Sequence, residues 1–376
     1  MAAIVEHLEN GVTVYQVTDS PHITSNIYCE RPYASEDGRR FLYARRMDPE
    51  ANDWEYVLCE FGTWTERVVG RGELSVTVSY NNDTYYSQRT AAGVELHRID
   101  FGTGANTVAF RIADPKARAG HPAVSPDARY LAWHDVVSFD PQQFCIVVAD
   151  LETGKQEVVC EDAYLCNAHL QFDPAEGRIL QVQHNRGCEF TPEGTRVLLV
   201  GEEGATVFLL DIRDGKRTPL RVGKPFTTPM TGHQTWVGQS DEMIATVAAT
   251  GHFLPEKGNI VLVRPGQDAR QIGAGWRMCH IGSTPCGSYF HADGYDAGPA
   301  SGVDNAVIIV GSPRSGKTRY VCHSHAAYSA LGFGQQGHPH AYLTPDFRWV
   351  VFNSDRTGTP QTYAAKLPEH FLDGLE

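Results

Sequence analysis

Short apolar runs separated by polar turns follow one another along nearly the whole chain. In the clearest recurring element, a Ser or Thr precedes an acidic turn, and an apolar strand follows directly. Its copies are SEDGRRFLYAR (35–45), SPDARYLAWHD (125–135), TPEGTRVLLV (191–200) and TPDFRWVVFNSD (344–355), with looser copies at 173–183 and 285–294. Pro and Asp favour the turn, and the β-branched and aromatic residues after it favour strands. The pattern predicts an all-β chain, with helical periodicity only in short stretches such as 366–376.

A second element recurs further along each unit. It consists of an apolar strand, a polar turn that contains Gly, and another strand, which is typical of a hairpin. Its copies are at 146–159, 207–220, 260–272 and 308–321. The two elements together give a repeat of about four strands, and repetition of this kind is typical of propellers.

We count seven such units and predict a single-domain, seven-bladed β-propeller with four-stranded blades over residues 1–376. The expected blades span approximately 22–68, 70–113, 117–162, 163–223, 228–275, 276–325 and 333–368. The strand at 11–18 lies outside these units and is expected to complete the last blade, which would close the ring. The fourth unit is long, and we expect it to carry an extra hairpin around 184–195.

Composition excludes several classes of partner. The net charge of −13 argues against a nucleic-acid partner, since such proteins usually present a basic surface. No window of about 20 apolar residues occurs, so we expect no membrane span. The N-terminal segment has no basic region and no long apolar run, so we expect no signal peptide. The nine cysteines form no CxxC pair, and reduced thiols in a cytoplasmic protein fit this pattern best.

The segment GSPRSGKT (311–318) matches the pattern of a phosphate-binding loop. In such a loop, the N-terminus of a following helix receives the phosphates. Here RYVCHSH follows, which is typical of a strand, and the segment occupies the same place in its unit as the turns at 152–155 and 213–216. We therefore predict an outer hairpin turn and no nucleotide partner.

Histidines recur just before the first strand of several units. They are His121, His169, His233, His280, His338 and His340. In a propeller this position lies where the chain enters the central channel, so equivalent residues converge there. Imidazole is the commonest metal ligand, and His338 and His340 are two residues apart, so both can face the channel from an extended segment. Gln335 could add an amide oxygen, and such a set suits a divalent ion such as Mn²⁺; the alternative is a polar channel mouth that holds ordered water.

Four segments give the sequence a resemblance to the oligogalacturonate lyase family. They are PHITSNIYCERPY (21–33), TGHQTWVG (231–238), MCHIGSTPCGSYFHADG (278–294) and QQGHPHAYLTPDFRWVVFNSD (335–355). The resemblance covers nearly the whole chain, and its most specific part is the QxxHxH element. It implies a cytoplasmic seven-bladed propeller that splits short oligogalacturonides by β-elimination.

The resemblance also implies roles for particular residues. The family's manganese ligands, three histidines and one glutamine, correspond to His280, Gln335, His338 and His340, with Gln336 as a neighbouring alternative to Gln335. Its catalytic base corresponds to His233, which we expect across the channel from the metal ligands. Its substrate-contacting arginine has no match, because Thr206 stands in that neighbourhood; Arg186 is the nearest replacement. The residues that we expect to contact the acidic oligosaccharide substrate are Arg31, His121, His169 and His184.

Two other kinds of function compete with a lyase. A non-catalytic propeller of the TolB or WD40 type would serve as a protein-binding platform and would need no convergent histidines. A metal-dependent hydrolase or isomerase that acts on another acidic sugar could use the same histidines. β-Elimination differs from both because it leaves an unsaturated uronate as product.

Overall fold

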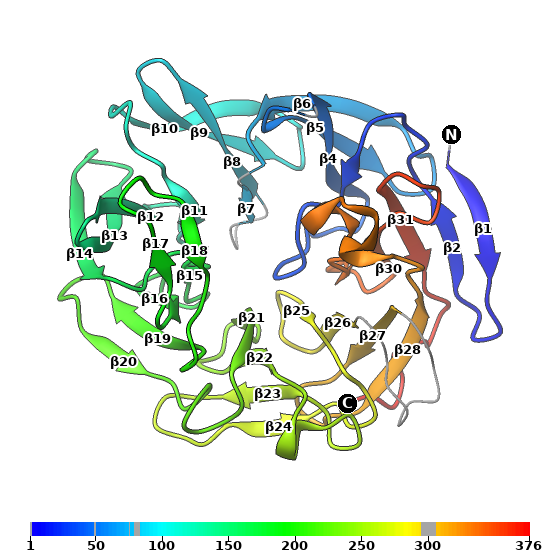
Figure 1. The fold of residues 1–376 in the computed structure, drawn as a ribbon. Helices are drawn as coiled ribbons and strands as arrows, with labels where there is room; N and C mark the ends of the chain where they lie inside the picture. The colour runs from blue at the N-terminus through cyan, green and yellow to red at the C-terminus, as the bar shows by residue number, and fades with distance from the viewer. Residues whose placement is uncertain (1, 49, 75, 79–82, 295–305) are drawn as a thin grey trace.

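The computed structural model describes residues 2–376 except 49, 75, 79–82 and 295–305. Within these residues, seven antiparallel blades stand around a common centre (Figure 1). The molecule is therefore a seven-bladed β-propeller, as the repeat predicts. A single bridge between Ala205 and Met230 links the fourth blade to the fifth, so these two form one continuous sheet.

The blades follow one another in chain order. Blades one to three are β3 (Thr24–Ser25), β4 (Arg40–Asp48), β5 (Asp53–Glu60) and β6 (Glu66–Gly72); β7 (Val76–Val78), β8 (Asp83–Thr90), β9 (Gly93–Asp100) and β10 (Asn106–Ile112); and β11 (Gly120–Val124), β12 (Tyr130–Phe139), β13 (Gln142–Asp150) and β14 (Gln156–Asp162). Blades four to six are β15 (Gln171–Phe172), β16 (Ile179–Asn185), β19 (Ala205–Asp211) and β20 (Arg217–Pro219); β21 (Met230–Trp236), β22 (Met243–Val247), β23 (Ile260–Val263) and β24 (Arg270–Ile272); and β25 (His280–Ser283), β26 (Phe290–Gly294), β27 (Val307–Gly311) and β28 (Thr318–His323).

The last blade is built from both ends of the chain. It contains β29 (Tyr342–Leu343), β30 (Trp349–Ser354), β31 (Gln361–Lys366), β2 (Thr13–Gln16) and β1 (Ala3–His7). Strand β2 pairs antiparallel with β31, from Thr13 opposite Lys366 to Gln16 opposite Tyr363. The N-terminal segment therefore joins the blade that ends the repeat, and this pairing holds the ring together.

Four short elements lie outside the blades. They are the hairpin β17 (Glu189–Phe190) and β18 (Arg196–Leu198), and the 3₁₀ helices η1 (Gly251–Phe253), η2 (Tyr328–Leu331) and η3 (Gly334–Gly337). The hairpin is inserted in blade four, between β16 and β19. Helix η3 leads directly into the segment that contains His338 and His340.

The core lies between neighbouring blades, where apolar side chains of one sheet pack on the next. Phe61 of blade one stacks on Trp349 of blade seven with 4.9 Å between ring centroids, and Trp64 meets Trp349 edge-on at 5.5 Å. Stacked sheets with aromatic and aliphatic side chains between them bury apolar area at every blade interface. This packing fixes the inner strands, which carry the candidate site.

Two sequence motifs acquire definite structures. The chain at 369–374 forms turns and not a helix, and His370 has a positive φ of 65° that a helix does not accommodate. GSPRSGKT forms the turn between β27 and β28, so a strand follows Lys317. The Lys317 ammonium donates a hydrogen bond to the Gly374 carbonyl at 3.0 Å. Among the described residues, no helix is long and apolar enough to span a membrane.

Candidate metal centre

A cavity of about 930 Å³ lies among the inner strands. Residues of β11, β15, β21 and β25 contribute to its lining, as do Gln335, His338 and His340 of the segment before β29. These four strands are the innermost of four consecutive blades (Figure 1). The first strand of each blade faces the centre, so polar residues near its start point toward one shared space.

Three histidines meet on one side of this cavity. His280 begins β25, and His338 and His340 follow η3. The ligand atoms of the three side chains lie within 4.8 Å of one another, and the side chains are almost fully buried. Nδ1 of His338 is 3.3 Å from Nε2 of His280. The structure thus brings together three of the four residues to which the sequence assigns metal ligation.

A buried carboxylate orients His280. Asp293 on β26 stands opposite His280 in the strand register, and its Oδ1 accepts a hydrogen bond from His280 Nδ1 at 2.6 Å. The same carboxylate accepts hydrogen bonds from the Tyr328 hydroxyl at 3.2 Å and from the backbone N–H of Ala341 at 3.0 Å. Burial opposes charge on His280, but the attraction of Asp293 outweighs it and raises the pKa of His280 to about 10 in the metal-free protein, so a cation that binds Nε2 displaces a proton from it. Carboxylate–imidazole pairs of this kind fix the ring of a metal ligand and leave Nε2 to face the ion.

His340 supplies the observation that tests whether a metal fits. Both of its ring nitrogens are buried and have no hydrogen-bond partner among the described residues. Its backbone adopts a positive φ of 44°, and its ring packs against Tyr28 with 4.7 Å between centroids. Burial, and then the neighbouring His280, hold the pKa of His340 well below its usual range, so the ring is neutral and one of its two nitrogens offers a free lone pair. Buried polar atoms are almost always paired, so orphaned nitrogens beside two further imidazoles fit a bound divalent cation.

Two neighbouring glutamines could supply the fourth expected ligand. Gln335 and Gln336 both line the cavity from η3, and Gln335 accepts a hydrogen bond from the backbone N–H of His338 at its own carbonyl. The two glutamines therefore remain alternatives for an amide ligand.

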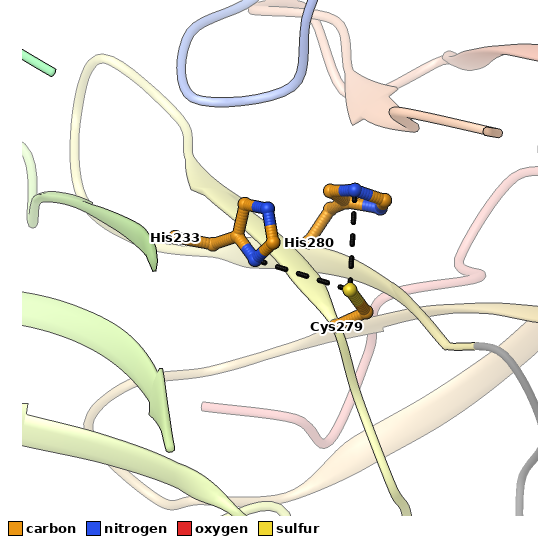
Figure 2. A group of neighbouring side chains, drawn as sticks. All are labelled: His233, Cys279 and His280. Carbon is orange, nitrogen blue, oxygen red and sulfur yellow. Dashed lines mark hydrogen bonds between the residues drawn. The ribbon is translucent and has the colours of Figure 1, made fainter. Parts of the chain in front are cut away.

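His233 lies next to the three histidines. It is on β21, lines the cavity, and its ring centroid is 4.4 Å from that of His280 (Figure 2). The expectation that His233 lies across the channel from the metal ligands is wrong. β21 and β25 belong to neighbouring blades, which places the rings of His233 and His280 in contact. Burial, and then the proximity of His280, lower the pKa of His233 well below its usual range. A neutral imidazole that faces a cavity can accept a proton.

The expected substrate-binding residues fall into two groups. His169 and Arg31 line the cavity; His169 bonds Glu30 through Nδ1 at 3.0 Å, and Arg31 donates to the Trp236 carbonyl at 3.3 Å. His121 lies on β11, but its side chain falls outside the described part of the structure.

His184 and Arg186 are not among the residues that line the cavity. Side chains alternate between the two faces of a strand, and on β16 it is Gln183 and Asn185 that reach the cavity. His184 instead bonds Asp162 at 3.0 Å. Arg186 donates to the carbonyls of Gly204 at 3.0 Å and Glu203 at 2.7 Å, and so holds the base of the inserted hairpin.

Several cavity residues have no place in the sequence-based site. They include Arg118, Arg196, Glu30 and Gln171. Asp293 and Cys279, which contact His280 from behind the cavity wall, were not predicted either. The sequence could have indicated Cys279 as a site residue, because it adjoins His280 in MCHIGS. Arg196 lies in a copy of the repeated turn-strand element, where it resembles any strand residue.

These features define a class of protein: a seven-bladed propeller with a buried cluster of imidazoles on one wall of its central cavity.

No family model matches the sequence. The oligogalacturonide lyase of Pectobacterium atrosepticum is 22% identical over 96% of this chain and 94% of its own length. The oligogalacturonate lyase of Dickeya dadantii shows the same identity and coverage. A solved structure of oligogalacturonate lyase in complex with manganese superposes with a TM-score of 0.75 at 18% identity, over 99% of this chain and 98% of that chain, and supports the fold. The chain is a distant relative of the oligogalacturonate lyases.

Proposed function

We propose that this protein is a metal-dependent lyase that cleaves short uronate oligomers, of the oligogalacturonide type, by β-elimination in the cytoplasm. The observation that carries the proposal is the group of three buried imidazoles with a fourth, neutral imidazole in contact with it on the wall of a large cavity. The curated relatives and the manganese-bound neighbour carry the names of such enzymes.

His280, His338 and His340, with Gln335 or Gln336, are the residues that would hold the metal, which we propose is Mn²⁺. When bound, a divalent cation neutralises the carboxylate of the uronate and stabilises the charge that develops beside it. The chain's own contribution is to fix the imidazoles: Asp293 holds His280, and it also holds the backbone next to His340 through Ala341. One carboxylate therefore ties together the two segments that provide the ligands.

His233 is the candidate for the general base. β-Elimination begins with removal of the proton at C5 of the sugar, next to the carboxylate. His233 must be neutral to accept this proton, and burial, the largest cause of its lowered pKa, favours the neutral form. Its contact with His280 supports this role, because a sugar whose carboxylate faced the metal ligands would lie beside His233.

The cavity can also attract an acidic substrate although the whole chain carries a charge of −13. Three arginines, Arg31, Arg118 and Arg196, line it, against the two carboxylates of Glu30 and Glu73. A local excess of positive charge can oppose the global sign and raise the local concentration of an anionic ligand. We propose that these arginines, and not Arg186, contact uronate carboxylates.

The decisive experiment separates the base from the ligands. His233→Ala is expected to reduce turnover of an oligogalacturonide by about 10²- to 10⁴-fold while the protein keeps its metal. His338→Ala is expected to lose both metal and turnover. The control is His252→Ala, an exposed histidine on η1, which is expected to change neither quantity. If His233→Ala retains full turnover, His233 is not the base; if wild-type protein with Mn²⁺ forms no unsaturated product from any uronate oligomer, the proposed function is wrong.

A further inference from the structure

A second group of potential ligands overlaps the first. His233, Cys279 and His280 also offer ligand atoms that lie within 4.8 Å of one another (Figure 2). The Cys279 sulfur is 3.9 Å from Nδ1 of His233 and 3.9 Å from Nε2 of His280. The thiol thus stands between the proposed base and one of the proposed manganese ligands.

We propose that His233, Cys279 and His280 form a binding site for a thiophilic divalent cation such as Zn²⁺, and that this cation and the Mn²⁺ of the proposed function exclude each other. The argument for the competing ion rests on ligand chemistry. Thiolate and imidazole together are the ligands that Zn²⁺ and related soft ions prefer, whereas Mn²⁺ favours sets without sulfur. A site with three protein ligands leaves a fourth position for water, as in many zinc sites.

Hydrogen bonds hold Cys279 and His280 in place, and the Thr231 hydroxyl lies 3.3 Å from Nδ1 of His233. The backbone N–H of Cys279 donates to the Asp293 carbonyl at 2.8 Å, and the Cys279 carbonyl accepts from the Thr246 hydroxyl at 2.7 Å. Nδ1 of His280 is engaged by Asp293, so Nε2 is the atom left for a metal. The cavity reaches both His233 and His280, which gives an ion a path to the site.

Mutual exclusion follows from the shared imidazole. Nε2 of His280 faces both the Cys279 sulfur and Nδ1 of His338, at 3.9 and 3.3 Å. A ring nitrogen has one lone pair and binds one metal ion at a time. A cation bound between His233 and Cys279 therefore takes a ligand from the manganese set. It also occupies the lone pair of the proposed base, and the thiol proton of Cys279 passes to solvent as the thiolate binds.

Cadmium is a suitable probe, because a cadmium–thiolate bond gives a charge-transfer absorption in the ultraviolet. Metal-free wild-type protein is expected to bind one Cd²⁺ per chain with this absorption. Cys279→Ser is expected to lose the absorption and to bind Cd²⁺ at least about tenfold more weakly, since removal of a ligand should cost no less than loss of a group that only orients one. The same variant is expected to bind Mn²⁺ as the wild type does. Cys286→Ser, which removes the exposed thiol, is the matched control and is expected to behave as wild type.

Competition and alkylation complete the test without any substrate, so its result is independent of the lyase proposal. Addition of Cd²⁺ to the manganese-loaded protein is expected to release one Mn²⁺ for each Cd²⁺ bound, and Cd²⁺ is expected to slow alkylation of Cys279 in the unaltered chain. Absorption that persists in Cys279→Ser, or unchanged alkylation of wild-type Cys279, would overturn the site. Simultaneous binding of both ions would overturn the exclusion, and loss of Mn²⁺ binding in a folded Cys279→Ser protein would show that there is one site and not two.

Discussion

Substitution of Asp293 by Asn changes the hydrogen bonding behind the metal ligands while it conserves shape. The carboxylate accepts from His280 and Tyr328 at one oxygen and from the Ala341 backbone at the other. An amide has a single acceptor oxygen, so its NH₂ group must replace one of these acceptors. If the NH₂ faces Ala341, a buried N–H loses its partner. If it faces His280, Nδ1 must accept, the proton moves to Nε2, and that nitrogen is no longer a ligand.

Either outcome has a measurable cost. Loss of a group that orients a metal-bound histidine typically weakens metal binding by about 10- to 100-fold, which corresponds to about 1.4 to 2.7 kcal/mol. A buried donor left without a partner costs about 1 to 3 kcal/mol of the free energy of unfolding. We therefore expect calorimetric titration of chelator-treated Asp293→Asn with Mn²⁺ to show this weakening, and denaturant unfolding of the metal-free variant to show the loss of stability.

Tyr328→Phe provides the control. It removes one of the three donors to Asp293 but leaves those from His280 and Ala341 in place, so most of the metal affinity is expected to remain. If Asp293→Asn binds Mn²⁺ as tightly as wild type, or if Tyr328→Phe weakens binding equally, Asp293 does not act by orienting His280.

Three further predictions follow from the placement of individual side chains. Lys317→Ala is expected to alter the free energy of unfolding by no more than about 0.5 kcal/mol and to leave turnover unchanged, because the exposed ammonium only bonds the Gly374 carbonyl. Loss of nucleotide binding on this change would contradict the hairpin interpretation. Arg196→Ala is expected to raise KM for a uronate oligomer with metal content intact, whereas Arg186→Ala is expected to lower stability with less effect on KM. A larger rise in KM for Arg186→Ala than for Arg196→Ala would restore Arg186 as the substrate contact. Burial lowers the pKa of His291 to about 4, below its value of about 6.5 in an unfolded chain. The unfolded chain therefore binds more protons between these values, and the free energy of unfolding should fall as the pH drops from about 6.5 to 4. A His291→Gln protein with the same pH slope would exclude this group as a cause.

The fold follows from local signals in the sequence. Each copy of the acidic turn followed by an apolar run specifies a turn and a strand by itself, and a chain of seven such four-stranded units has few ways to bury its apolar faces. The GSPRSGKT segment shows the same principle, because the apolar residues after Lys317 favour the strand β28 over the helix that a phosphate-binding loop requires.

Only part of the candidate site could be predicted from the sequence. His280, His338 and His340 could be identified because each stands at the start of a unit, where the chain meets the centre. His184 illustrates the limit: a shift of one residue along β16 moves a side chain from the cavity face to the opposite face, and the sequence alone does not set that register.

Asp293 and Cys279 depend on contacts between elements that are distant in the chain. Asp293 acts on His340 through the N–H of Ala341, 48 residues away. Cys279 gains its neighbour His233 from the preceding blade, 46 residues away. Asp293 lies in the looser copy of the turn-strand element at 285–294, but neither that copy nor the place of Cys279 beside His280 shows which residues they contact, so only the packing of the strands reveals their partners.

The masses of the products test the central claim most directly. A purified oligogalacturonide of one length is incubated with metal-free protein to which Mn²⁺ is added in steps, and the products are analysed by mass spectrometry. β-Elimination adds no water, so the masses of the two fragments are expected to sum to that of the substrate, with one fragment unsaturated, and the rate is expected to reach a plateau at one Mn²⁺ per chain. Fragments whose summed mass exceeds the substrate by one water, or cleavage at the full rate before any metal is added, would contradict the account.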